Sequence, residues 1–469
     1  MSKKAVMSLV SLGSVVLVTL AGCRSFNGEK VRREHAESYQ EQLALKTADA
    51  IKPQEPLTLD DCIVIALENS LEVKSADIQS RIATLERKTA FSNFLPTVSL
   101  NYREMHFDPE VIKKIGGFEA AMSDKRVREV TWDIQMSIFN PATWFLYSMY
   151  SRGAEIADLV TEYTRQMIVL QVTADYFYCL SLDEYERAVA SQLKAAEALH
   201  TEVEAFRTEG LVTDWQAGEA QLLVQAREVE LSRTERTRTQ AKAELLTDMG
   251  LSPLAEITLQ PETPLEPEGG TLEALVAEAL LCHPQLRISD LQIEIEQEKV
   301  KTAFTSFLPV LLGFASHMDS SDSFLKYSNY WTGGLAATMT VFNGFANVNE
   351  YKAAKERRRE SFIEREQASL AVMLEVIRAH LALETAREET ALASQALDVA
   401  SRHFRESRQK WQEGLIRASE LLDVTAKRDQ AQMQAISAHF QYQVTVATLL
   451  NAMGKTKIDY EEPEHDGAS

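Results

Sequence analysis

The sequence predicts a mainly α-helical chain that also contributes strands to a membrane β-barrel. Three observations lead to this fold class. A unit of about 200 residues occurs twice, long stretches carry no helix breaker, and four short segments change from helical to alternating periodicity. We therefore expect each unit to build both a helical rod and a pair of strands.

The repeat is visible by direct comparison of the two halves. Residues 59–102 align with residues 272–315 at an offset of 213, which superposes Phe94-Leu95-Pro96 on Phe307-Leu308-Pro309. Later landmarks recur at an offset of 204, namely Glu209-Gly210-Leu211 with Glu413-Gly414-Leu415, and Met249-Gly250 with Met453-Gly454. Two copies of one supersecondary unit thus make up most of the chain.

Each copy predicts one very long helix and one composite rod. No Gly or Pro pattern breaks the helix between Pro141, a suitable first-turn residue, and Gly210, a suitable terminator. Apolar residues between Leu182 and Phe206 recur at steps of three and four, as in a coiled-coil seam. A second rod is expected at about 212–249. In the second copy the rods fall at 346–412 and 417–453, and each copy begins with a short and a longer helix.

Four strands are predicted at about 97–105, 130–139, 310–317 and 331–342. In the first, Val98, Leu100 and Tyr102 alternate with polar residues, and the run from Val130 to Ile138 behaves in the same way. Ten residues are enough for a tilted strand to cross a bilayer. Segments 106–129 and 319–330 are polar and are expected to be external loops.

An alternative interpretation of these strands is two soluble hairpins packed on the helices. The membrane interpretation is favoured by Arg103, Asp133 and Gln135 on the polar face and by Tyr102 and Trp132 near strand ends. Four strands cannot close a barrel, and lipid does not tolerate open strand edges. The chain must then oligomerise, and two, three or four copies would give 8, 12 or 16 strands.

The predicted organisation has six parts. They are a signal peptide at 1–22, a polar segment at 23–56, the first repeat at 57–250, a Pro-rich connector at 251–270, the second repeat at 271–454, and an acidic tail at 455–469.

The N-terminal segment resembles the signal of a bacterial lipoprotein. Lys3 and Lys4 precede an apolar stretch that is too short for a membrane span, and the segment ends in Leu20-Ala21-Gly22-Cys23. This resemblance to a lipobox implies cleavage before Cys23 and acylation of that residue. The alternative is an ordinary signal peptide with an incidental cysteine. After Cys23 no stretch approaches an apolar 20-mer.

Composition excludes several function classes. With 69 acidic and 49 basic residues the net charge is −20, and a surface of that overall charge disfavours nucleic acid and anionic lipid as partners. Cys62, Cys179 and Cys282 are scattered, so we expect buried thiols and neither a disulfide framework nor a metal site. No phosphate-binding loop or nucleophile motif is present, so neither an enzyme nor a cofactor is predicted. His283 at a helix junction is expected to act as a cap.

The order of these features resembles the outer membrane efflux protein family, the TolC-like channels. The resemblance rests on the lipobox, the two helix–hairpin–helix–helix copies, Phe-Leu-Pro before each hairpin and a Gly-Leu turn between long helices, and it covers about residues 57–454. It implies a homotrimer with a 12-stranded barrel in the outer membrane and a helical tunnel through the periplasm. It also implies a passive exit duct served by a periplasmic adaptor and an inner-membrane pump, lipid-anchored at the outer membrane.

The resemblance further implies a gate where the helix pairs turn, at Gly210 and Gly414. Residues six and nine positions after the second glycine are Glu420 and Asp423, which would form two rings of three carboxylates in a trimer. The alternative is that both are ordinary solvated residues. The family's lock between the two turns is altered, because Gln216 replaces an acidic residue and Arg417 is shifted by one position. Asp214 is the expected substitute partner of Arg417.

Two functions of different class remain open at this point. One is the exit channel, for small molecules or for secreted proteins. The other is a pore-less, coiled-coil scaffold lipoprotein that spans the periplasm. The scaffold gives no role to the four alternating segments, so the channel is the favoured hypothesis.

Overall fold

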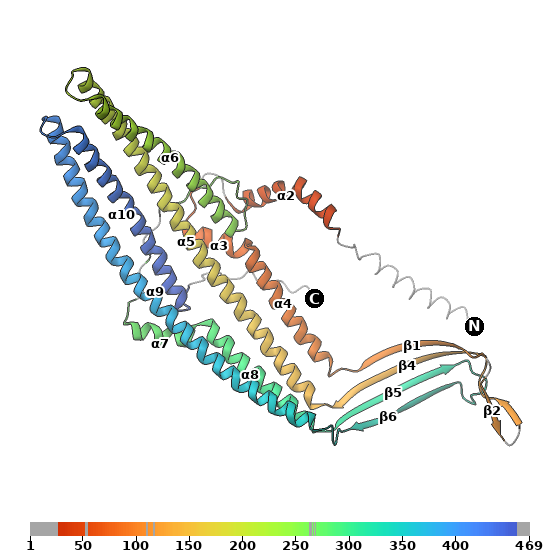
Figure 1. Cartoon of the computed structure of the whole chain (residues 1–469). Helices are drawn as coiled ribbons and strands as arrows, with labels where there is room; N and C mark the ends of the chain where they lie inside the picture. The colour runs from red at the N-terminus through yellow and green to blue at the C-terminus, as the bar shows by residue number, and fades with distance from the viewer. Residues whose placement is uncertain are drawn as a thin grey trace.

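The computed structural model describes residues 27–51, 55–108, 111–115, 118–261 and 269–456, together with residues 265 and 267. Long helices lie side by side along most of the molecule, and a four-stranded sheet extends from one end of them (Figure 1). The signal peptide 1–22, Cys23 and most of the acidic tail lie outside the described residues.

The helices follow the repeat. The first copy contains α3 (Leu59–Asn69), α4 (Leu71–Ser92), α5 (Pro141–Thr208) and α6 (Asp214–Asp248). The second contains α7 (Leu272–Cys282), α8 (Pro284–Thr305), α9 (Ala346–Gln412) and α10 (Ala418–Ala452). One further helix, α2 (Gly28–Ala50), precedes them within the predicted N-terminal segment.

Local chemistry explains where these helices begin and end. Thr58 and Asp61 form a reciprocal capping box at the start of α3, and Pro141 occupies the first turn of α5. His283 caps α8 as predicted, since its Nδ1 accepts a hydrogen bond from the Gln285 N–H at 3.2 Å. Such caps satisfy N–H groups that have no partner within the helix.

Four antiparallel strands form one open sheet in the order β1-β4-β5-β6. They are β1 (Thr97–His106), β4 (Arg126–Phe139), β5 (Val310–Ser320) and β6 (Asn329–Thr338). The central pair, β4 and β5, joins the first repeat to the second, and β1 and β6 are the two edges. Each repeat therefore supplies one half of the sheet.

The strands differ from their predicted limits in ways that pairing explains. β4 begins at Arg126 because β1 continues to His106 and pairs with it there. β6 ends at Thr338, opposite Val310, because β5 does not extend past that residue. The segment predicted as a plain external loop also contains a short hairpin, β2 (Ile112–Ile115) and β3 (Phe118–Ala121).

Two apolar cores lie where the short helices meet the long ones. In the first, Tyr176 and Phe177 of α5 are buried against Leu245 and Met249 of α6. The Tyr176 hydroxyl lies 3.1 Å from the carbonyl oxygen of Leu57 and 2.5 Å from that of Gln260, which ties the connector to the core. The second core repeats the arrangement around α7, α9 and α10.

The cysteines correct one prediction. Cys62 and Cys179 are buried, and burial raises the pKa of Cys179 to about 12. Cys282, which was also expected to be buried, is exposed. It is the last residue of α7, where His283 and Pro284 take the buried positions as the chain turns into α8.

Candidate functional site

The turns of both long helical hairpins lie at the end of the molecule opposite the sheet (Figure 1). A third apolar cluster joins them, with Val203 of α5 and Leu421 of α10 fully enclosed. Phe206 packs edge-on against Trp411 with ring centroids 5.4 Å apart. The structure thus brings together the two predicted tip turns, which are about 200 residues apart in the chain.

Both turn glycines adopt the left-handed conformation that ends a helix. The φ angle is +76° at Gly210 and +72° at Gly414. The N–H of Leu211 returns to the carbonyl oxygen of Phe206 at 2.9 Å, and the N–H of Leu415 returns to that of Lys410 at 2.8 Å. A backbone hydrogen bond that spans six residues in this way is characteristic of the Schellman motif at a helix C-terminus. The motif needs a residue in the left-handed conformation, which is sterically unfavourable for residues other than glycine.

Glu420 and Asp423 lie in the first two turns of α10 and are exposed. Their spacing of three residues places them on neighbouring positions of one helix face. Asp423 pairs with Lys427 of the same helix, Nζ to Oδ2, at 2.6 Å. Among the described residues Glu420 makes no ion pair, so the two carboxylates have different electrostatic surroundings.

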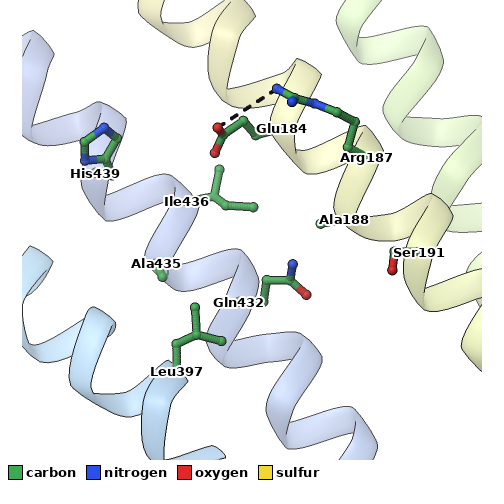
Figure 2. A pocket seen from close by; sticks show the side chains of 9 residues that line it. All are labelled: Glu184, Arg187, Ala188, Ser191, Leu397, Gln432, Ala435, Ile436 and His439. Carbon is green, nitrogen blue, oxygen red and sulfur yellow. Dashed lines mark ion pairs between the residues drawn. The ribbon is translucent and has the colours of Figure 1, made fainter. Parts of the chain in front are cut away.

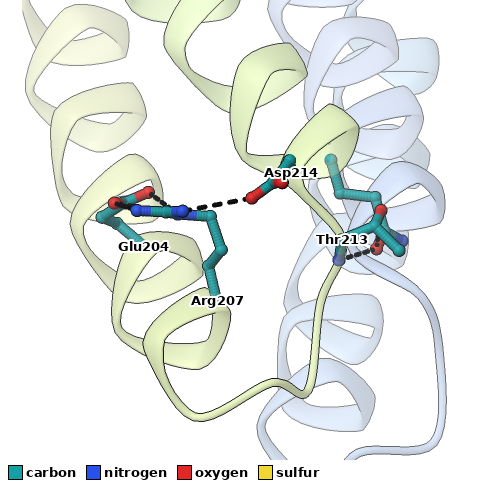
Figure 3. Close-up of polar contacts among 5 residues, drawn as sticks. Glu204, Arg207, Thr213 and Asp214 are labelled. Carbon is teal, nitrogen blue, oxygen red and sulfur yellow. Dashed lines mark hydrogen bonds and ion pairs between the residues drawn. The ribbon is translucent and has the colours of Figure 1, made fainter.

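The predicted pairing of Asp214 with Arg417 does not form within the single chain. Asp214 instead accepts from Arg207 Nη1 at 3.1 Å, and Arg207 also binds Glu204, which lies one turn earlier in α5 (Figure 3). Hydrogen bonds to the Glu204 and Asp214 carboxylates raise the pKa of the Arg207 guanidinium above its ordinary value. The same guanidinium lowers the pKa of Glu204. Asp214 is therefore held by its own hairpin.

At the first turn, Gln216 caps its own helix where the resemblance led us to expect an acidic residue that links the two turns. Its Oε1 accepts from both the backbone N–H and the hydroxyl of Thr213, each at 2.9 Å, so it closes a capping box on α6. Arg417 occupies the N-cap position of α10, and its side chain makes no hydrogen bond or ion pair with the described residues. The two turns are consequently joined by apolar contacts at this level.

Sequence reasoning missed a polar link above the tip. Asp429 of α10 is almost fully buried and accepts from Arg227 of α6, Nη2 to Oδ2, at 2.8 Å. Gln192 of α5 donates to Gln432 of α10 at 3.2 Å. The signal was available, because Asp429 follows the buried Leu421 and Thr425 at steps of four and so occupies a position where an apolar residue is expected.

A shallow groove separates α5 from α9 and α10 above this link (Figure 2). Its volume is about 460 Å³, and it is lined by Glu184, Arg187, Ala188, Ser191, Leu397, Gln432, Ala435, Ile436 and His439. Within the part of the chain that the structure describes, no cluster of His, Cys, Asp and Glu has the arrangement of a metal site. In the same part, every helix is too short or too polar to cross a bilayer.

Comparison with known proteins agrees with this architecture. The model of the outer membrane efflux protein family matches residues 275–455. Among curated proteins, none matches the chain in sequence.

Three solved structures show the extent of the structural likeness. A membrane protein from Pseudomonas aeruginosa has a TM-score of 0.75 at 16% identity, with 84% of this chain and 90% of that chain covered. The Campylobacter jejuni outer membrane channel CmeC scores 0.74 at 16% identity, covering 86% and 87% of the two chains. The Vibrio cholerae outer membrane protein VceC scores 0.71 at 15% identity, covering 84% and 96%.

These matches confirm the predicted fold class, long helices joined to a sheet that contributes to a barrel. The resemblance noted from the repeat is confirmed as well, by sequence over the second copy and by fold over most of the chain. The chain is therefore similar to the outer membrane efflux protein family in sequence over residues 275–455, and similar in fold to solved outer membrane channels over most of its length.

Proposed function

We propose that three copies of this chain form a passive exit duct through the outer membrane and the periplasm. The supporting observation is the open four-stranded sheet at one end of helices 67 and 68 residues long. Such helices are about 100 Å in length at 1.5 Å per residue. A sheet for the membrane and a rod of this length match the two parts of a duct.

The sheet has the surface of a barrel segment. Leu100, Trp132 and Leu335 are large apolar residues on one face and stay exposed. The other face carries Asp133, which accepts from Asn101 at 2.8 Å and from Ser316 at 2.7 Å. An apolar outer face and a hydrogen-bonded polar inner face are typical of a barrel in lipid. Three chains would supply 12 strands and leave no free edge.

The duct would close at the helical tip. Three chains would place Glu420 and Asp423 in two stacked carboxylate rings, which attract cations and repel one another. Because Asp423 is paired with Lys427, we assign the stronger field to Glu420. The altered contacts of Gln216 and Asp214 leave this closure to the acidic rings and the apolar cluster at the tip.

The proposed duct would need partner proteins, and Cys23 would anchor it in lipid. A periplasmic adaptor and an inner-membrane pump would supply energy and cargo, and both small-molecule efflux and protein secretion fit a passive duct. Cys23 would carry acyl chains that add a lipid anchor at the outer membrane. Labelled palmitate should enter the wild-type protein and not the variant C23S.

The decisive test distinguishes the duct from a pore-less scaffold. Membranes containing the full chain are washed with carbonate and urea, and the protein is then extracted in detergent. The duct predicts resistance to both washes, a trimer by light scattering, and discrete conductance steps in planar bilayers. Protein that washes off, or a trimer that never conducts, would favour the scaffold.

A further inference from the structure

The face of the sheet that meets lipid ends in a charged cluster whose role the duct does not explain. This face follows from the register, which pairs Leu100 with Trp132 and Tyr102 with Val130. The next two pairs on the same face are Glu104 with Arg128 and His106 with Arg126. The apolar surface therefore changes to charge within one step of two residues.

The height of this cluster can be estimated from strand geometry. Nine residues of β4 separate Val130 from Phe139, which is about 30 Å of strand at 3.4 Å per residue. At a tilt of about 40° this gives a band roughly 23 Å tall, close to the apolar band of an outer membrane barrel, about 25 Å. Arg128 and Arg126 then lie just outside the hydrocarbon, at the level of the outer-leaflet headgroups.

Arg128 is the less firmly paired of the two arginines in the cluster. Arg126 pairs with Glu104, and the Tyr102 hydroxyl donates to the same carboxylate at 3.1 Å. Arg128 Nε lies 3.9 Å from Glu104 Oε1, too far for a hydrogen bond. Its side chain is 47% exposed and makes no other ion pair with the described residues.

Two other charged groups lie nearby, and neither forms an ion pair with Arg126 or Arg128 among the described residues. Asp319 lies across β5 opposite Val130, one row closer to the hydrocarbon, and no ion pair joins it to either arginine among the described residues. Arg103 is adjacent to Glu104 in sequence but points to the opposite face, where it faces Glu129 at 4.0 Å. Two guanidinium groups therefore share one carboxylate on the outward face.

We propose that Arg126 and Arg128 bind a phosphate group on the headgroup of an outer-leaflet glycolipid. A guanidinium presents a planar fork of donors that matches phosphate oxygens, and the pair is spaced by two residues on one strand face. The lipid's acyl chains would lie along the adjoining apolar face with Trp132 and Trp331, which are both exposed. This proposal rests on the proposed barrel, because the face must meet lipid.

The test uses the full-length trimer in detergent or lipid nanodiscs. Native mass spectrometry measures retention of diphosphorylated lipid A, dephosphorylated lipid A and, as a soluble competitor, inorganic phosphate. We expect the wild-type trimer to retain the diphosphorylated lipid, and the variant R126Q/R128Q to retain about tenfold less. R128Q alone should lose most of this binding while leaving the Arg126–Glu104 pair intact.

The matched control is R103Q, which removes the same charge at the same height from the opposite face. It should leave lipid retention within about twofold of wild type. Equal loss in R103Q and R128Q, equal retention of the dephosphorylated lipid, or displacement by inorganic phosphate at millimolar concentration would each overturn the proposal. A conducting trimer that retains no lipid defeats this inference alone, whereas a chain that forms no conducting trimer defeats the duct.

Discussion

Arg227 of α6 and Asp429 of α10 form a buried ion pair that joins the two helical hairpins of one chain, with Nη2 and Oδ2 2.8 Å apart. Arg428 binds the other Asp429 oxygen and lies 4.4 Å from the Phe404 ring of α9. One carboxylate thus connects α6 and α10 and, through Arg428, α9. It lies six residues above Asp423, or about 9 Å along the helix. The relative placement of the hairpins near the proposed gate depends on it.

The variant R227A should loosen this junction. Removing one partner of a buried pair costs about 3–5 kcal/mol, and because Arg428 stays in place we expect about 1–3 kcal/mol. Thermal unfolding should report the loss, and planar bilayers should show a larger or noisier conductance. R227K keeps the charge and should recover at least half of the effect. Equal behaviour of R227A and wild type in both measurements would count against the junction.

The proposed acidic rings predict that two kinds of variant change the block by divalent cations in opposite directions. E420A/D423A should raise single-channel conductance and weaken block by divalent cations, because the carboxylates that attract them are gone. K427A should strengthen the block instead, since Lys427 at 2.6 Å neutralises Asp423 in the wild type. Recordings over a series of Mg²⁺ concentrations would measure both. If all variants match the wild type, these residues lie outside the conducting path.

Asp175 makes stability dependent on pH. Burial and the neighbouring Asp248 carboxyl raise the pKa of Asp175 from 3.8 to about 7, and Glu244 adds to this, whereas the hydrogen bond from Gln171 opposes it. The folded state then binds more protons than the unfolded state between these two values, so stability falls as pH rises from about 4 to 7 and levels off above. The melting temperature of the wild type should fall across this range.

The variant D175N should lose this part of the pH dependence. Its melting temperature should exceed that of the wild type at pH 8 by more than it does at pH 5, since the amide stays neutral. D248N serves as the companion variant and should flatten the same range. A wild-type profile that is flat from pH 4 to 7 would show that the pKa of Asp175 is not raised in the folded protein.

Gly250 should be far less tolerant of substitution than Gly210. Both have φ near +70°, where a side chain costs about 1–2 kcal/mol. A Cβ at Gly250 would also lie 2.3 Å from the Asn69 carbonyl oxygen, whereas nothing lies within 4 Å at Gly210. We expect G250A to cost about 3 kcal/mol or more and G210A about 1 kcal/mol, measured by denaturant unfolding. Equal costs would contradict the close approach.

Much of the fold could be predicted from the sequence, because the patterns that mark helices and strands are local and occur in both copies of the repeat. The limits of α9 match the predicted residues 346–412, since glycines at positions 344 and 414 mark where the regular periodicity starts and stops. The sheet pairing between β4 and β5 was not predicted, because alternation shows which residues share a face but not which strands are neighbours.

The tip was less predictable than the fold. The sequence does not show which arginine Asp214 binds, and the side-chain geometry shows that within the chain it is Arg207. Gln216 was recognised as a departure from the family pattern, but its capping bond to Thr213 depends on where α6 begins. Cys282 was expected to be buried from residue type alone, and the turn at His283 decides otherwise.

The pairing of β4 with β5 determines the order in which the strands of the sheet can pair as the chain emerges. As the chain emerges from its N-terminal end, β1 and β4 can form a hairpin, but β4 then waits for a partner about 180 residues further on. Its outer edge of unpaired N–H and C=O groups would be open to other strands throughout that interval. An edge left unpaired for that interval is exposed to wrong pairing until Ser320 has been released.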